Sequence, residues 1–372
     1  MSVFLFLKQI VDVLYPYHWL DYMMVIMVGV ALIYQILLVR PNVKKSITTS
    51  DILIVLMVIL LSVSFLKDID AYGVYVKVLS AFLMYFVGRI YYERIKECTD
   101  ALVTSAYLIV YMNFFYRLYQ VGMSGIFKVT NAGGDLYYYD TDMAFAMILA
   151  ISFIGMYGRN ILGKYITIFL VCPYMVSFSD AGIQKILLVV ILFLMFLYML
   201  EKVTGKKRIT NSLILICILG LLCLIVALIL PVFMGENDIN LGGFANGSIL
   251  NKKNMYARYE QWQGILTGLE GADLVTKLFG INLLIQAGSL YLKTLYSLGI
   301  MGILLLVAFI VSVIYYVVRI EDRKTFYVMV LLAVILLGTG VTVDSMEATQ
   351  MSWFPMMFAG MVISSVQNGR KA

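Results

Sequence analysis

The residues of this sequence with the most potential for chemistry are charged side chains inside or beside long apolar segments. They comprise the cations Lys77, Arg117, Lys185 and Lys293 and the acids Asp142, Asp180, Asp344 and Glu347. A charge kept beside an apolar segment is costly, so each is a functional hypothesis by default. Cations gathered in one cavity would bind a phosphate or pyrophosphate, with arginine clamping two oxygen atoms at once.

One long polar segment, residues 234–294, adds further candidates. It opens with a stretch rich in glycine and asparagine, which is typical of a loop. Residues 256–269 (YARYEQWQGILTGL) then space aromatic and apolar residues as an amphipathic helix does. This predicted helix carries Arg258 and Glu260. A carboxylate such as Glu260, Asp142 or Glu347 could deprotonate a hydroxyl group that lies within hydrogen-bond reach.

The amino-acid composition indicates the class of protein in which these residues are positioned. Hydrophobic residues make up 62% of the 372 residues and charged residues only 13%, whereas soluble domains carry about 45–50% and about 25%. A bilayer accommodates that much apolar surface, and a soluble fold does not. The formal net charge of +6 then reflects cytoplasmic loops rich in Lys and Arg rather than a nucleic-acid partner.

The sequence therefore predicts an all-α polytopic membrane protein with about 11–12 transmembrane helices and one large extracytoplasmic loop. A spanning helix needs about 20 mostly apolar residues. Eleven segments meet this need: 20–39, 51–67, 72–91, 101–120, 141–157, 160–178, 182–200, 211–233, 295–319, 325–343 and 351–367. Residues 2–15 would lie at the interface or form a twelfth helix. The chain divides into N-terminal helices (1–233), the loop (234–294) and C-terminal helices (295–372) of one integrated membrane domain.

Charge in the connections predicts the orientation. Alternate connections are rich in Lys and Arg, from Arg40, Lys44 and Lys45 to the tail residues Arg370 and Lys371. Such loops face the cytoplasm. The C-terminus is therefore expected inside and the long segment outside.

Each candidate also has a plainer explanation. Lys77 and Lys293 can extend along the helix to the interface. Arg117 follows several aromatic residues that would anchor a helix end, and Lys185 can pair with Asp180. Asp344, Glu347 and Arg258 can be solvated surface charges.

Histidine and cysteine usage excludes several kinds of site. His18 is the only histidine, and none of the four cysteines forms a CxxC pair. Zinc sites and histidine-based acid/base schemes are therefore not expected. No metal or other cofactor is predicted.

The order of motifs resembles that of Wzy-type polysaccharide repeat-unit polymerases and O-antigen ligases. The resemblance covers about 100–367. It rests on Arg258 shortly before Trp262, on Leu278-Phe-Gly280, on Gly288-Ser-Leu-Tyr291-Leu, and on Leu298-Gly-Ile-Met-Gly302. Ser177–Lys185 and Asp344–Phe354 match the family's neighbouring segments.

The resemblance implies a metal-independent, inverting membrane glycosyltransferase of the C type (GT-C-like), embedded in the bacterial cytoplasmic membrane. Its substrate would be an undecaprenyl-pyrophosphate-linked oligosaccharide, and the growing glycan would pass to the next unit. Membrane lipids would surround it, and a chain-length regulator is a further partner that the family admits. By motif position Arg258 and Lys185 would contact pyrophosphate and Tyr291 would line the cavity, while Arg117 and Lys293 are further cationic candidates. Arg258, Glu260 and Tyr291 are the predicted catalytic residues.

One departure bears on the activity. Ligases of this family carry a histidine-containing pair just before the tyrosine, where this chain has Gly288 and Ser289. This favours a polymerase over a ligase and leaves the general base unassigned. A surface-glycan ligase and a polysaccharide or lipid transporter (flippase) remain the alternatives.

Overall fold

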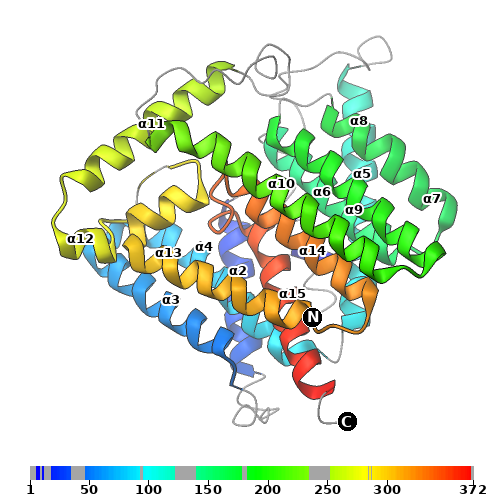
Figure 1. Ribbon diagram of the computed structural model, residues 1–372, viewed down its shortest axis with the longest axis horizontal. Helices are drawn as coiled ribbons and strands as arrows, with labels where there is room; N and C mark the ends of the chain where they lie inside the picture. Colours follow the sequence, from blue (N-terminus) through cyan, green and yellow to red (C-terminus); the bar gives the residue numbers. More distant parts are fainter. Residues whose placement is uncertain are drawn as a thin grey trace. The chain divides into compact units, whose positions relative to one another are not determined.

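The computed structural model describes residues 6–8, 11, 18–34, 47–92, 95–121, 140–177, 182–233, 252–283, 285 and 287–369, and every element among them is helical (Figure 1). The helices are α2 (His18–Tyr34), α3 (Thr49–Lys67), η3 (Ile69–Ala71), α4 (Tyr72–Tyr91), α5 (Ile95–Val121), α6 (Asp140–Tyr157), α7 (Ile161–Ile166), η6 (Thr167–Val171), α8 (Cys172–Ser177), α9 (Gly182–Thr204), α10 (Lys207–Phe233), α11 (Lys252–Glu270), α12 (Leu274–Phe279), α13 (Leu290–Val317), α14 (Arg323–Thr339) and α15 (Thr349–Gly369).

The described parts of the predicted apolar segments lie mostly on helices; residues 318–319 and 340–343 lie beyond the ends of α13 and α14, and residues 35–39 and 178 are outside the described residues. The segment 160–178 consists of three consecutive pieces, α7, η6 and α8, rather than one regular helix. Pro173 explains this difference, because proline cannot donate to the carbonyl one turn earlier. The hydrogen-bond ladder widens there into the π-helical turn η6.

Five stretches of the described chain are long and apolar enough to cross a membrane. They are Thr49–Lys67, Ile69–Tyr91, Cys98–Tyr119, Gly182–Thr204 and Leu290–Val317. The protein is thus a helical membrane protein by the length and composition of these helices. The number of crossings, eleven or twelve, and the side faced by each end stay predictions.

The chain folds into two compact units, each built from separate stretches of sequence. The first comprises residues 1–24, 94–221 and 327–335, and the second comprises 25–93, 222–326 and 336–372. In the first unit α6 packs against α5, α8 and α9. Its side chains from Met143 to Met156 are almost all buried, as expected of a helix that is apolar all round.

In the second unit α3 packs against α13 and α4, and α4 packs along α15 (Figure 1). Two glycines allow the close approach of α4 and α15. A Cβ atom on Gly88 would stand 1.9 Å from the carbonyl oxygen of Met357, and one on Gly360 would stand 2.1 Å from that of Tyr85. Small residues at a membrane helix crossing let the backbones touch in this way. Helix α15 is buried continuously from Thr349 to Ser364.

Helix α13 is broken at Gly299. This residue has φ 70° and ψ −168°, a conformation nearly restricted to glycine. The helix begins at Leu290, earlier than the predicted 295, and the sequence pattern did not indicate the break. Residues 300–317, beyond the break, extend about 27 Å at about 1.5 Å per residue, close to the about 30 Å core of a bilayer.

Other segments satisfy the backbone groups at the break. The N–H of Ile281 donates to the carbonyl of Tyr296 over 2.7 Å, and Ser64 Oγ donates to the carbonyl of Ser297 over 2.7 Å. Lys67 Nζ donates to the carbonyl of Gly280 over 2.8 Å. The end of α3 and the turn after α12 therefore hold the broken segment, which meets the need for internal pairing of irregular backbone in a membrane protein.

Candidate functional site

A buried ion cluster lies where α13 begins and where the chain passes from α14 to α15. The ammonium group of Lys293 lies 2.9 Å from Asp344 Oδ2 and donates a hydrogen bond to Glu347 Oε2. The side chains of Lys293, Asp344 and Glu347 are 9%, 13% and 30% exposed. Three residues that the sequence singled out separately therefore meet, and Glu347 is the most accessible of them.

The connection between α14 and α15 is fastened to the start of α13 by several hydrogen bonds. The N–H of Leu290 donates to the carbonyl of Gly340 over 2.8 Å, and Ser289 Oγ donates to the same carbonyl over 3.3 Å. The hydroxyl of Tyr291 donates to the carbonyl of Leu337 over 2.7 Å. Tyr291, a predicted catalytic residue, thus anchors this junction, and its predicted catalytic role stays a prediction.

Asp344 is also fixed by its own connection. Its Oδ1 accepts from the backbone N–H groups of Met346 and Glu347 over 3.3 and 3.4 Å. This local pairing, common for Asp in turns, together with the ion pair to Lys293, holds the Asp344 carboxyl in one place.

The two acids of the cluster differ in their electrostatic environments. Burial raises the pKa of Asp344, although the charge of Lys293 opposes this. Burial would also raise the pKa of Glu347, but Lys293, with the further cation Lys77 on α4, outweighs burial and holds that pKa below its usual value. The two environments therefore move the pKa values of the acids in opposite directions, lowering that of Glu347 and raising that of Asp344, a separation typical of acid/base sites.

Helix α11 packs onto the start of α13. Trp262 Nε1 donates to the carbonyl of Ala287 over 2.8 Å. A buried apolar cluster surrounds this bond and consists of Trp262, Ile265, Leu269, Ala287, Leu292 and Val341. The predicted amphipathic helix is therefore present, and its described apolar face rests on α13 and on the residues just after α14.

The loop candidates differ in how far the structure describes them. Glu260 is exposed on α11. Arg258 belongs to α11, but its side chain lies outside the described residues. It precedes Trp262 by four residues, about one helical turn.

The remaining candidates belong to the first unit. Arg117, on α5, is 1% exposed, and its guanidinium carbon lies 5.7 Å from the centre of the Tyr174 ring. Lys185 is half-buried in the first turn of α9. Asp142 lies in the first turn of α6, and its side chain is outside the described residues. The prediction that all these groups share one cavity with Lys293 stays a prediction.

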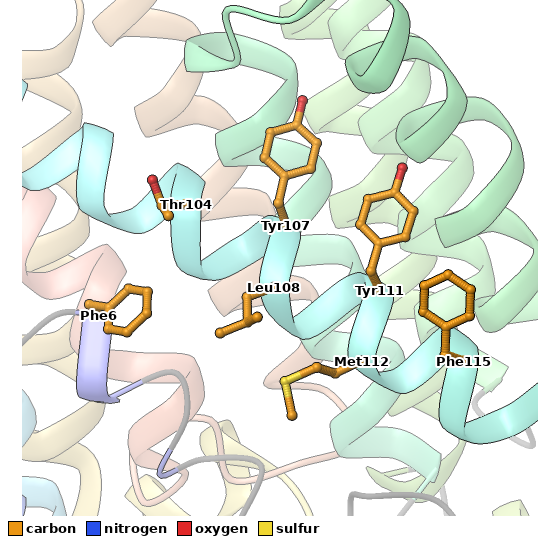
Figure 2. A pocket seen from close by; sticks show the side chains of 7 residues that line it. All are labelled: Phe6, Thr104, Tyr107, Leu108, Tyr111, Met112 and Phe115. Carbon is orange, nitrogen blue, oxygen red and sulfur yellow. The ribbon is translucent and has the colours of Figure 1, made fainter.

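The first unit also has an apolar groove of about 610 Å³ along α5. Its lining is Phe6, Thr104, Tyr107, Leu108, Tyr111, Met112 and Phe115. Figure 2 shows these side chains following one another along α5, with Phe6 facing them from an N-terminal segment. The groove carries no charged side chain, so it offers hydrocarbon contact rather than chemistry.

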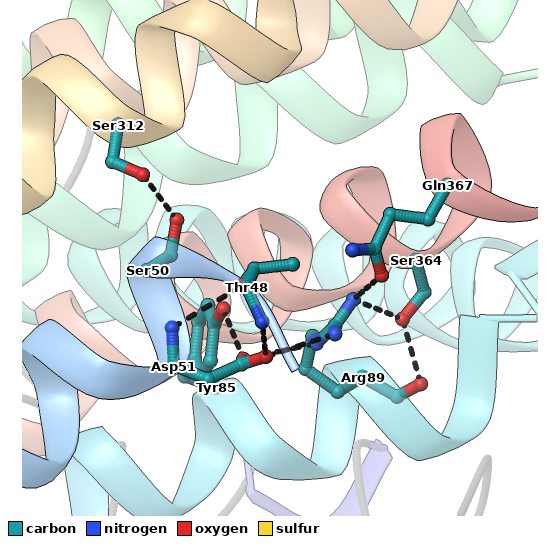
Figure 3. A network of polar contacts seen from close by, with 8 residues as sticks. All are labelled: Thr48, Ser50, Asp51, Tyr85, Arg89, Ser312, Ser364 and Gln367. Carbon is teal, nitrogen blue, oxygen red and sulfur yellow. Dashed lines mark hydrogen bonds and ion pairs between the residues drawn. The ribbon is translucent and has the colours of Figure 1, made fainter. Parts of the chain in front are cut away.

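A second polar network lies at the C-terminal end of α4 (Figure 3). Arg89 pairs with Asp51 over 3.0 Å and donates to Ser364 and Gln367 over 2.9 and 3.0 Å. The hydroxyl of Tyr85 also donates to Asp51 over 2.7 Å. Neither Arg89 nor Asp51 was among the predicted site residues. The signal that could have indicated the pair is that an acid and a base stand at helix ends expected on the same side of the membrane.

The described residues contain no group of three or more His, Cys, Asp or Glu side chains that could hold a metal ion. Comparisons with protein-family models, with curated proteins and with solved structures gave no significant match.

Proposed function

We propose that this protein polymerises oligosaccharide repeat units linked to undecaprenyl pyrophosphate, on the outer face of a bacterial cytoplasmic membrane. The growing glycan leaves its lipid carrier and is transferred to the next unit. The support from the sequence is the order of motifs from Arg258 to Gly302.

One structural observation lends this proposal its main support. Helix α11, which carries Arg258, rests on the start of α13 through Trp262, and Lys293 at that start forms the ion cluster with Asp344 and Glu347. Two segments far apart in the sequence thus bring these titratable groups together at the start of α13, the part of that helix on which α11 rests. A glycan-transfer site needs such an arrangement of carboxylate and cationic groups.

Charge balance assigns different tasks to the cations. The negative charges of Asp344 and Glu347 balance the positive charges of Lys293 and Lys77. Because little net positive charge is left, the cluster alone would bind pyrophosphate weakly. A pyrophosphate would therefore depend on a further cation, and Arg258 is the candidate on the adjoining helix. Its guanidinium can clamp two phosphate oxygens.

The chemistry requires positioning more than activation. The acceptor hydroxyl oxygen forms a bond to the anomeric carbon of the donor glycan. The bond from that carbon to the pyrophosphate oxygen breaks, and the lipid pyrophosphate leaves with the electron pair. Holding both substrates and stabilising the leaving charge can supply much of the barrier reduction.

The test replaces Arg258 by Ala in cells that make the glycan. We expect short products, mainly single repeat units, in place of long chains. Lys277→Ala, which removes one cation from the neighbouring helix α12, is the matched control and should leave chain length unchanged. A normal ladder in the Arg258→Ala variant would exclude this role for Arg258.

A transporter is the second candidate, and the break in α13 favours it. Discontinuous helices are typical of transporter binding sites. The Lys293 cluster, however, lies at helix ends rather than in the middle of a helix. The two functions differ in where lipid-linked units collect when the gene is deleted, which is the inner face for a transporter and the outer face for a polymerase.

The ligase alternative is disfavoured at the position of its histidine pair. Gly288 has φ 54°, a left-handed conformation that favours glycine, and Ser289 is the residue before α13. Glycine adopts such a positive φ far more readily than histidine does.

A further inference from the structure

We infer that Glu347 is the general base that takes the proton from the acceptor hydroxyl, with Lys293 and Asp344 as positioning residues. This inference rests on the proposed function and assigns a base that the sequence left open among three carboxylates.

Glu347 differs from Asp344 in how exposed its side chain is to solvent. Its side chain is 30% exposed, whereas those of Asp344 and Lys293 are 13% and 9% exposed. Asp344 is also engaged by two backbone N–H groups of its own connection. A hydroxyl group entering from outside the protein therefore meets Glu347 first.

Glu347 differs from Glu260 in that its carboxylate is held in a fixed orientation. Glu260 is exposed on α11, and its carboxylate has no ion pair or hydrogen bond among the described residues. Glu347 is held through Oε2 by Lys293, which is itself fixed in the first turn of α13. A carboxylate has about four lone-pair positions, so Glu347 can accept a hydroxyl hydrogen while it keeps Lys293. A base that is already oriented needs no further ordering when substrate arrives.

The charges around Glu347 favour its ionised form, which is the form that can accept a proton. Lys293 faces it from α13, Lys77 from α4, and Asp344 from its own connection. The two ammonium groups outweigh burial and hold the pKa of Glu347 below its usual value. In the reaction the hydroxyl proton moves to the Glu347 carboxylate as the oxygen bonds to the anomeric carbon, and the lipid pyrophosphate leaves. The proton is then released to water, which restores the carboxylate.

The experiment measures the polymerisation rate of purified protein with lipid-linked repeat units as a function of substrate concentration and pH. Glu347→Gln should lower kcat by about 10²–10⁴-fold, the usual contribution of a general base, with KM changed far less. Asp344 still pairs with Lys293 in this variant, so thermal stability should stay near that of the wild type. Glu270→Gln, which changes an exposed carboxylate at the end of α11, is the matched control and should keep kcat within a few fold.

A second variant tests the role through pH. The wild-type rate should fall at acidic pH as Glu347 becomes protonated. Lys77→Met removes one of the cations that lower the Glu347 pKa, so this acid limb should move to higher pH. If Glu347 had only a structural role, Lys77→Met would not shift the acid limb of the pH–rate profile.

The outcomes separate the inference from the function on which it rests. A wild-type ladder with an equally active Glu347→Gln variant, or an acid limb that Lys77→Met does not move, would overturn the base assignment alone. An inactive wild-type protein would overturn the polymerase proposal together with it.

Discussion

Replacing Gly299 by Ala should destabilise the second unit, because the break in α13 depends on this glycine. An added Cβ would stand 2.3 Å from the carbonyl oxygen of Leu278. Backbone cannot yield as a flexible side chain would. The junction between the turn after α12 and the broken helix must therefore open.

The magnitude follows from two contributions. Holding Ala at φ 70° and ψ −168° costs about 1–3 kcal/mol. Opening the junction weakens the hydrogen bond from Ile281 to the Tyr296 carbonyl, which contributes about 0.5–1.5 kcal/mol. The expected loss in the free energy of unfolding is therefore about 1.5–4.5 kcal/mol.

The assay is thermal unfolding of the purified protein in detergent, followed by tryptophan fluorescence at one scan rate. One kcal/mol corresponds to about 2–4 °C in domains of about 150–250 residues, so the midpoint should fall by several degrees. Gly264→Ala on α11 is the control, since its added Cβ meets no atom within 4 Å. It should melt at or slightly above the wild-type temperature, because Ala is the better helix former. Equal melting of Gly299→Ala and wild type would refute the reasoning.

Two further changes test other parts of the second unit. Arg89→Lys keeps the charge but loses the paired geometry with Asp51, so it should cost about 1–3 kcal/mol in thermal unfolding. The exposed pair of Arg159 with Asp100 gives the control, since Arg159→Lys should change stability by less than about 1 kcal/mol; equal losses would contradict a buried clamp at Arg89. Trp262→Phe removes the indole donor to a backbone carbonyl and should lower the free energy of unfolding by about 0.5–1.5 kcal/mol. The polymerisation rate should also fall, because α11 is then held less firmly on α13. An unchanged melting temperature and rate would show that this bond does not hold the helix.

The sequence predicted the helices better than it predicted their irregularities. Long apolar runs are determined by local composition, so the described parts of the eleven segments lie mostly on helices. The amphipathic spacing around Trp262 was likewise sufficient to predict α11. The break at Gly299 was not predictable, because Leu298-Gly-Ile-Met-Gly302 also fits a continuous helix. It depends on the tertiary approach of the turn at Gly280.

The site was predictable only in its residue types. Lys293 and Glu347 were each selected as charges beside apolar runs, but their pairing joins residues 54 positions apart in the sequence. Charge type alone also did not show that Asp344 and Glu347 would already neutralise Lys293. Because both acids already pair with Lys293, the proposed pyrophosphate site would depend more on Arg258 than on Lys293.

The most direct test of the polymerase proposal is a reconstitution. Purified protein in liposomes is given a single kind of undecaprenyl-pyrophosphate-linked repeat unit, and the products are separated by length. We expect a ladder of glycans on the lipid carrier, with release of undecaprenyl pyrophosphate for each bond formed and no requirement for an added metal ion. Repeat units that cross the bilayer but stay single, or that stay single and unmoved, would contradict the proposal.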